Sequence, residues 1–568
     1  MNLRWLWFAI CLALSAVLLG AGLLVPAHLR AVDASVLLVA GRNGPSLPEQ
    51  IRALAEEKKW GAASLLAQAA RQAQIPDADA WDATVTNWMR QSPGTVFWGD
   101  DERTAKIFGN PLTLTEAPWP LTDFLIRPEN REAALAHLGE SPVAAVQELL
   151  RVRSLNDTVL FPPSSSASGQ ALDAAIAIGG LLLDGNRLTP DLSRQIFNLA
   201  RRANGGSSEP LEQTLMDFLS LGRRFNWDQL TTFVAEIRRV STLQRLAAEA
   251  RAADENLPVL FAAVQLSGQP AAVADYLAAF PETGWRDLKA GLRYGAGGVA
   301  ELVKSRKRFY DSTVERRLTA YDPFGAFYFR AANVTAQRPR LALTAKWFLY
   351  LLAGFFAALA LHCARPAVSP LERPLQVRGF HLAREFLFSL AFLLAVLLLS
   401  EPFLAQESQN RQGIFSLRLI PSTAGGTVPA GIAGFKQTVM NPTIVLTLLV
   451  FFVLQALLYV SSLVKLAEIR RQNVPPRMKL KLLENEDHLF DAGLYLGFVG
   501  TIVSLIIASL GLVKFSLMAA YSSTSFGIVF VVIFKIFHLR PARRKWLLEA
   551  EAQEAPTPAP AAPAPALS

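Results

Sequence analysis

Residues 492–513 read AGLYLGFVGTIVSLIIASLGLV, an apolar run long enough to cross a lipid bilayer as a helix. Small residues recur along this run at intervals of three or four, namely Gly493, Gly497, Gly500, Ser504, Ala508 and Gly511. That spacing puts them on one face of an α-helix. Since lipid is as apolar as leucine, a face of small residues favours close approach of a second helix backbone. The run therefore predicts a membrane helix with a tightly packed face.

The next apolar segment, residues 517–537, contains a polar run, Ser522-Ser523-Thr524-Ser525, and then Gly527. We expect the two segments to form a helical hairpin in which Gly527 also serves packing. The hydroxyls of Thr501 and of the polar run should face protein or water. Alternatively, these hydroxyls bond to the carbonyl four residues earlier on their own helix, as hydroxyls in membrane helices often do. The sequence leaves both interpretations open.

Six apolar segments in all are long enough to span a membrane, and 51% of the residues are hydrophobic. We expect an all-α membrane protein of about six transmembrane helices with a large extracytoplasmic, solenoid-like helical domain. The segments cover residues 6–25, 347–362, 386–403, 443–464, 492–513 and 517–537.

The predicted domains follow from this pattern. They are residues 1–30, a signal anchor or first span; 31–340, the outer helical domain; 341–404, spans two and three with an Arg- and Pro-containing inner loop; 405–441, an outer Gly- and Pro-rich loop; 442–540, spans four to six; and 541–568, a basic segment with an Ala/Pro tail. The first segment could instead be a cleavable signal peptide. Its apolar core is longer than such peptides usually have, which favours an anchor.

Lysine and arginine predict the topology, because they accumulate in cytoplasmic loops. The loops after spans two, four and six are basic, as in Arg470-Arg471 and Arg543-Arg544-Lys545, while the turn after span five has only Lys514. We expect cytoplasmic N- and C-termini, residues 30–340 outside, and a bacterial inner membrane. The formal net charge of +9 lies largely in the inner loops next to lipid head groups, so no nucleic acid is expected as a partner.

The outer domain shows helical periodicity over residues 47–91, which we expect to form three helices, and over 172–184, 189–203, 210–221, 227–240 and 243–254. Helix pairs recurring every thirty-odd residues are typical of α-solenoids. Residues 92–125 are expected to be irregular or partly extended. Residues 304–308 are expected to form a basic helical patch on a solvated face.

The outer domain has few candidate catalytic or ligand-binding residues. The histidines are dispersed, with only His137 well inside the domain, and the two cysteines, Cys11 and Cys363, lie in or at the edge of spans. The glycine run that follows Tyr294 is expected to be a helix start and not a phosphate-binding loop, because no strand precedes it. We expect no enzyme, no cofactor and no metal site. No charged residue lies in the middle of a predicted span, so the chain alone is not expected to relay protons.

Residues 493–530 resemble the last two spans of the MotA/TolQ/ExbB proton-channel family. The similarity is carried by LYLGFVGTIVSLI at 494–506, which is similar to that family's Gly-x-x-Gly-Thr-Val-x-Gly-Leu-Ile segment, and by AAYSSTSFGIV at 519–529. The resemblance implies a ring of copies around a single-span partner that supplies a proton-carrying aspartate. Thr501, Ser504, Ser523, Thr524 and Ser525 would then line the pore. In this chain Ser504 stands where the family has its second glycine.

Two functional hypotheses remain. In the first, the chain is an integral membrane scaffold of the cell envelope whose outer domain binds a partner protein. In the alternative, it is a stator-like channel subunit of an ion-driven envelope complex. The expected partners are the lipid bilayer and a protein at the outer domain, with a second copy of the chain and a single-span membrane protein under the alternative.

Overall fold

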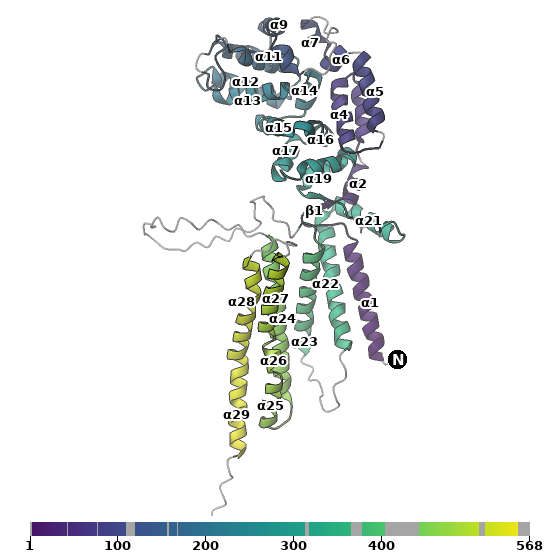
Figure 1. The fold of residues 1–568 in the computed structure, drawn as a ribbon, viewed down its shortest axis with the longest axis vertical. Helices are drawn as coiled ribbons and strands as arrows, with labels where there is room; N and C mark the ends of the chain where they lie inside the picture. The colour runs from purple at the N-terminus through teal and green to yellow at the C-terminus, as the bar shows by residue number, and fades with distance from the viewer. Residues whose placement is uncertain are drawn as a thin grey trace, which may run out of the picture. The chain divides into compact units, whose positions relative to one another are not determined.

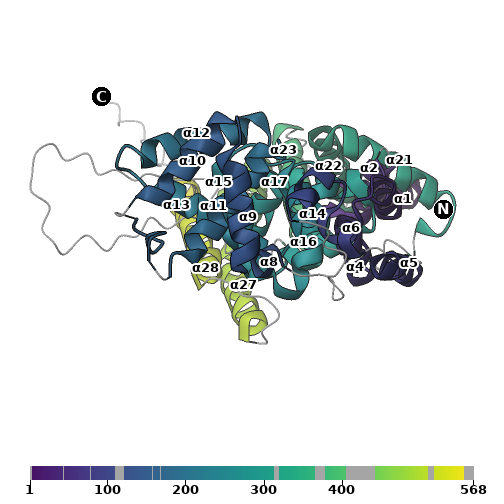
Figure 2. The same ribbon diagram turned by 90° about the horizontal axis from the view of Figure 1, so that it is seen from above.

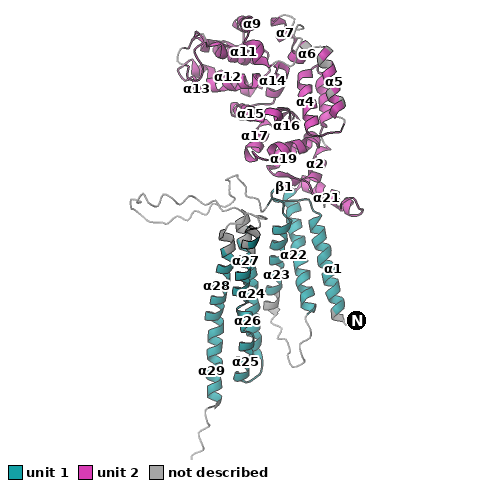
Figure 3. Cartoon of the chain, in the orientation of Figure 1, with its two compact units in different colours: residues 1–30, 339–568 teal, residues 31–338 magenta. Residues whose placement is uncertain are grey.

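The computed structural model describes residues 3–554 apart from 43, 77, 92, 109–119, 156–157, 167, 313–316, 318, 365–377, 404–441 and 510–516. The predicted outer loop 405–441, most of the inner loop after span two, the turn at Lys514 and the Ala/Pro tail thus lie outside the described residues. The contacts divide the chain into two compact units (Figure 3). Unit 1 comprises residues 1–30 and 339–568, and unit 2 comprises residues 31–338.

Unit 1 contains the apolar helices. Its elements are α1 (Leu3–Leu23), α22 (Pro339–Ala364), α23 (Arg378–Ser400), α24 (Pro442–Arg471), α25 (Pro476–Asn485), α26 (Asp487–Phe490), α27 (Ala492–Ser509), α28 (Leu517–Phe534), the π-helix η4 (Lys535–Leu539) and α29 (Arg540–Glu554). Helix α1 packs on α22, α22 on α23, α23 on α24, and α28 on both α24 and α27 (Figure 1).

Among the described residues, five helices are long and apolar enough to cross a membrane: α1, α22, α23, α24 and the continuous stretch Tyr521–Gln553. The fifth expected span, residues 492–513, begins as α27, whose shorter apolar part is Ala492–Ile502. Several boundaries differ from the prediction; for example, α23 begins at Arg378, eight residues before the predicted start of span three, and α24 runs to Arg471. Helix α22 begins at Pro339, eight residues before the predicted start of span two, and the last helix runs past Phe537 through η4 into α29. The N–H of the first residue of a helix has no partner within the helix, so a proline, which lacks this N–H, is well suited to that position. Pro339 therefore accounts for the early start of α22.

Unit 2 is built almost entirely of helices. They are α2 (Ala34–Gly41), α3 (Leu47–Glu56), α4 (Trp60–Gln72), α5 (Ala78–Gln91), α6 (Pro93–Trp98), α7 (Glu102–Ile107), α8 (Leu121–Leu125), α9 (Pro128–Gly139), α10 (Ala144–Arg151), η2 (Val152–Ser154), α11 (Gln170–Asp184), α12 (Pro190–Ala203), α13 (Glu209–Gly222), α14 (Trp227–Val234), α15 (Val240–Ala253), η3 (Asp254–Asn256), α16 (Leu257–Ser267), α17 (Pro270–Ala279), α18 (Gly284–Leu292), α19 (Gly295–Ser305) and α21 (Phe324–Gln337).

Several helices of unit 2 pack on the second helix along the chain. Helix α11 contacts α9 and α13, and α15 contacts α13 and α17 (Figures 1 and 2). The helices nearest the N-terminus depart from this order, because α4 packs on α14 and α16, and α2 packs on α19. Local sequence explains many of the boundaries. Ser46 with Glu49, and Asn226 with Gln229, form capping boxes at the starts of α3 and α14.

Three expectations for unit 2 are wrong in detail. The described part of residues 92–125 forms the short helices α6, α7 and α8 instead of an irregular stretch. The helix expected over 227–240 begins at Trp227 as predicted but ends at Val234, and a turn separates it from α15. The basic residues 304–308 do not share a helix face, since α19 ends at Ser305 and Arg306 adopts a left-handed conformation.

A short parallel sheet also lies in unit 2. Strand β1 (Ala31–Asp33) pairs with β2 (Arg308–Tyr310), with Val32 opposite Phe309. The predicted three helices over 47–91 are confirmed as α3, α4 and α5. The core of the unit is aromatic and aliphatic, and its largest fully buried side chains include Trp227, Tyr276, Phe218, Phe225, Phe233 and Phe261.

Candidate functional site

The predicted small-residue face of α27 lies against α28 and α24. A methyl group on Gly497 would stand 2.8 Å from the carbonyl oxygen of Ser523, and one on Gly527 would stand 2.6 Å from the carbonyl oxygen of Gly493. On Gly500 it would stand 2.6 Å from Ser523 Oγ. All three distances are shorter than van der Waals contact. The two backbones therefore approach each other as closely as they do because these positions are glycine.

The hydroxyls of this seam bond inside the chain. Thr501 Oγ1 donates to the Gly497 carbonyl, four residues earlier, at 3.1 Å, and Thr524 Oγ1 reaches the same carbonyl across the seam at 3.2 Å. The two hydroxyl oxygens lie 2.6 Å apart. This arrangement gives one carbonyl a partner on each helix, which ties α27 to α28 without a charged group.

Helix α24 contributes an amide to the same seam. Gln455 Nε2 donates to the Gly493 carbonyl at 3.0 Å, and the Gln455 side chain is buried. A methyl group on Gly493 would stand 2.9 Å from Gln455 Oε1. Gln455 was not among the residues predicted from the sequence. A polar amide in an otherwise apolar helix is the signal that would have found it.

The structure places the predicted pore residues at different depths. Thr501 and Ser523 are buried between the helices, Thr524 is half-buried, and the Ser525 side chain is exposed on α28. Ser504 and Ala508 belong to α27, but their side chains lie outside the described residues, as does all of Gly511. A pore-lining role for the five hydroxyl residues stays a prediction.

A buried charged cluster at the ends of α1, α22 and α23 was missed by the sequence reasoning. Lys346 Nζ donates to the carbonyl of Ala27 at 2.9 Å and lies 3.4 Å from His28 Nδ1. The same histidine nitrogen lies 3.8 Å from Glu401 Oε2, which also accepts from the N–H of Leu29 at 2.9 Å. Lys346 is 1% exposed. A cation, an imidazole and a carboxylate thus join three separate segments of unit 1.

The position of Lys346 explains the omission. The hydropathy pattern placed the start of span two at residue 347, which leaves this lysine just outside it. Because α22 begins at Pro339, Lys346 instead lies two turns inside the helix and its ammonium is surrounded by protein. Buried charges are usually hydrogen-bonded or paired, and this ammonium donates to the Ala27 carbonyl and lies beside His28.

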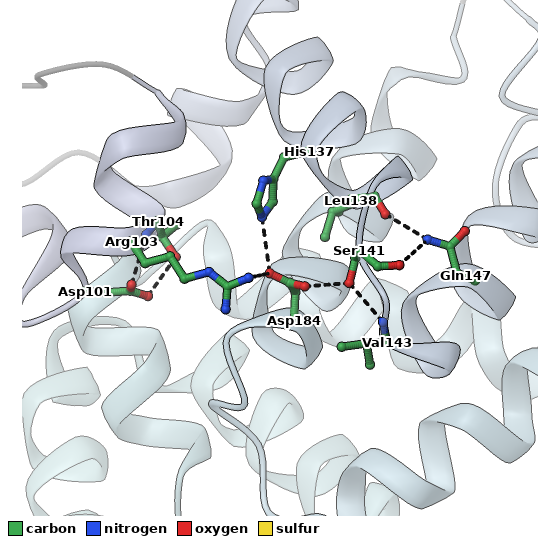
Figure 4. Close-up of polar contacts among 9 residues, drawn as sticks. All are labelled: Asp101, Arg103, Thr104, His137, Leu138, Ser141, Val143, Gln147 and Asp184. Carbon is green, nitrogen blue, oxygen red and sulfur yellow. Dashed lines mark hydrogen bonds and ion pairs between the residues drawn. The ribbon is translucent and has the colours of Figure 1, made fainter.

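In unit 2, Asp184 forms a polar cluster with residues from three other segments (Figure 4). His137 Nε2, from α9, lies 3.2 Å from Asp184 Oδ2, and Ser141 Oγ donates to Oδ1 at 2.5 Å. Arg103 Nη2, from α7, donates to Asp184 Oδ2 at 3.0 Å and completes the cluster. Burial acts to raise the pKa of the Asp184 carboxyl, but the hydrogen bonds from Ser141 and His137 and the charge of Arg103 hold that pKa below its usual value.

The order of groups in this cluster decides its chemistry. A serine nucleophile needs an imidazole between its hydroxyl and the carboxylate, so that the imidazole takes the proton. Here the carboxylate lies between, and both Ser141 and His137 bond to Asp184 (Figure 4). The serine hydroxyl therefore donates to an acceptor of low basicity and is not activated. The arrangement fastens α7, α9 and the loop after α9 to the end of α11.

No protein-family model, curated protein or solved structure matches the chain. The resemblance of residues 493–530 to the MotA/TolQ/ExbB proton-channel family stays a prediction. Within the part of the chain that the structure describes, no group of three or more His, Cys, Asp or Glu residues is arranged to hold a metal ion.

One loop of unit 2 presents apolar side chains while its backbone is hydrogen-bonded to a buried carboxylate. The N–H groups of Val159, Leu160 and Phe161 donate to the carboxylate of Glu212 at 3.0, 2.5 and 3.1 Å. Glu212 is fully buried in α13. Burial acts to raise its pKa, yet these N–H groups keep the pKa below its usual value. Phe161 is buried, whereas Val159 is 68% exposed and Leu160 is 40% exposed.

Proposed function

We propose that this chain is an integral membrane scaffold of the bacterial inner membrane whose outer unit, residues 31–338, binds a partner protein. The apolar helices of unit 1 anchor it, and the basic loops orient it with both termini in the cytoplasm. The helices of unit 2 that pack on their second neighbour support a solenoid-like array. Arrays of that kind offer extended surfaces for binding proteins.

The observation that carries the proposal is the loop over Glu212. Exposed apolar side chains usually occur singly, but Val159 and Leu160 are adjacent and their backbone N–H groups donate to a buried carboxylate. A preorganised apolar pair loses little conformational entropy when a partner covers it. Apolar anchors of this type dominate the binding energy of protein interfaces. We assign the loop as the contact with the partner.

Photo-crosslinking in intact cells tests the proposal on the full chain. A benzophenone amino acid at position 159 or 160 should give one discrete adduct, containing the same protein from both positions. The matched control is position 126, where exposed Ile126 lies on another segment and should give no such adduct. Glu212→Gln weakens the acceptor for the loop N–H groups and should lower the adduct yield. Membrane-inserted protein that gives no shared adduct from 159 and 160 would contradict the assignment.

The stator-like alternative is favoured by one observation, the exposed Ser525 on α28. Its neighbours along the outward face, Tyr521, Ile528 and Val529, are also exposed. A hydroxyl among apolar side chains on this face would suit a contact with another copy or with a partner's span. Native mass spectrometry of the protein extracted in mild detergent distinguishes the two functions. A ring of copies around a single-span protein supports the alternative, and a monomer refutes it.

A further inference from the structure

Helix α21 of unit 2 uses one face for packing inside the unit. Gly325, Tyr328, Ala332 and Thr335 are buried at intervals of three and four residues, and the helix contacts α2. The hydroxyl of Tyr328 donates to Asp33 Oδ1 at 2.7 Å, next to the short sheet. These contacts fix the helix, and most of its remaining side chains are exposed.

A second stripe of α21 is apolar and exposed. Phe324, Phe327 and Val334 are 49%, 42% and 44% exposed, and the spacing puts them along one edge of the helix beside the buried face. Tyr321, just before the helix, is 68% exposed. Asn333 and Gln337 lie on the polar side, opposite the buried face, and Phe329, which is 42% exposed, borders this side away from the stripe. Exposed aromatic residues clustered in this way need a partner that accepts apolar surface.

The helix that follows α21 in the sequence points to the lipid bilayer as this partner. Helix α21 ends at Gln337 and the apolar helix α22 begins at Pro339, so a single residue separates the exposed stripe from a helix able to cross a membrane. On α22 itself, the apolar side chains of Leu341 and Phe348 are exposed. Arg338 and Arg340 are exposed at the junction, where guanidinium groups suit lipid phosphates.

We infer that α21 is an interfacial helix, with Phe324, Phe327 and Val334 inserted among the lipid head groups and its polar side toward water. Aromatic rings are enriched at this depth because they are apolar and still tolerate water at one edge. Amphipathic helices bind the interface with their apolar face in the boundary between head groups and acyl chains. The inference rests on the membrane placement of α22 and not on the partner of the outer unit.

Spin labelling measures the depth directly. The two cysteines are first replaced as Cys11→Ala and Cys363→Ala, and single cysteines are then introduced as Phe327→Cys on the stripe and Asn333→Cys on the polar side. Ile126→Cys provides the water reference and Phe348→Cys the membrane reference. Each labelled protein is placed in nanodiscs of phosphatidylcholine and phosphatidylglycerol, and its collision rates with oxygen and with a nickel chelate are compared.

The label at 327 should show a ratio of oxygen to nickel collisions between those at 126 and 348, and above that at 333. Equal, water-like ratios at 327, 333 and 126 with a membrane-like ratio at 348 would overturn the inference and leave the proposed scaffold intact. A label at 327 that is immobilised and shielded from both reagents would show a protein contact instead, which also overturns it. A water-like ratio at 348 would remove the membrane placement and both proposals with it.

A second measurement avoids the cysteine replacements. A benzophenone amino acid at position 327 in the otherwise unaltered chain should crosslink to phospholipid, detected as an increase in the mass of the α21 peptide. Crosslinking to protein alone would overturn the inference.

Discussion

Replacing Gly497 by alanine should separate α27 from α28. The added methyl group would lie 2.8 Å from the Ser523 carbonyl oxygen and 3.2 Å from Thr524 Cα. Both neighbours are backbone atoms, so they cannot rotate away. Ordinary contact begins near 3.4 Å, and the helices must therefore move apart by about 0.6 Å. Gly500 faces the Ser523 side chain instead, which can rotate, and this makes Gly497 the sharper test.

The expected loss of stability follows from three contributions. Overpacking a tight contact costs about 1–3 kcal/mol. Lengthening the bond from Thr524 Oγ1 to the Gly497 carbonyl removes about 0.6 kcal/mol, the mean for such bonds between membrane helices. Alanine has a higher helix propensity than glycine by about 1 kcal/mol, which offsets part of the loss. Together these contributions predict that Gly497→Ala destabilises unit 1 by about 0.6–2.6 kcal/mol.

The matched control is Gly20→Ala in α1. It is the same substitution in another apolar helix, but no atom lies within 4 Å of the added methyl group. This variant should equal or exceed the parent in stability. Unfolding is followed in mild detergent by titration with a denaturing detergent, with helix content as the signal. If Gly497→Ala and Gly20→Ala unfold alike, the close approach of α27 and α28 is not what stabilises the seam, and the packing argument is wrong.

Two further predictions concern buried charges. Burial raises the pKa of the Asp228 carboxyl to about 7, against the Ala62 N–H that donates to it at 2.9 Å. The folded protein therefore binds a proton that the unfolded chain releases near pH 4, and stability should fall between about pH 4 and pH 7, by up to about 4 kcal/mol. Asp228→Asn keeps an acceptor oxygen and should remove this fall; a parent whose melting temperature is unchanged over that range would contradict it. In unit 1, Glu401→Gln should destabilise by about 3–5 kcal/mol, because the Lys346 cluster loses its anion, and the double variant with Lys346→Met should recover most of the loss. Thermal melting of both variants and the double variant measures this, and additive losses would exclude the coupling.

The sequence predicts those features of the fold that depend on local spacing. The apolar helices follow from runs of residues long enough to cross a bilayer, and the starts of α3 and α14 follow from short capping patterns. The contact of Gly497 with α28 was expected for the same reason, since small residues at helical spacing identify a packing face. Each of these signals lies within a few turns of one helix.

Other features bring together residues that are far apart along the chain, and no local pattern marks them. Strands β1 and β2 are three residues each and pair across more than 270 positions, so neither shows a readable alternation. Asp184 gathers Arg103, His137 and Ser141 from separate segments. Lys346 was missed because the apolar run of span two begins at residue 347, whereas α22 already begins at Pro339.

The two polar sites of unit 1 differ in how readily their helices can separate. The cluster of Lys346, His28 and Glu401 joins the ends of α1, α22 and α23 through buried charges. Separating these helices would leave an uncompensated charge in a low-polarity environment. The seam between α27 and α28 is held by neutral hydroxyls, and each of its bonds is individually weak. Thr501 can keep its bond to the Gly497 carbonyl on its own helix when α28 moves away. Any rearrangement that admits another span should therefore occur at α27 and α28, and a crosslink between these two helices should block it while a crosslink between α1 and α22 should not.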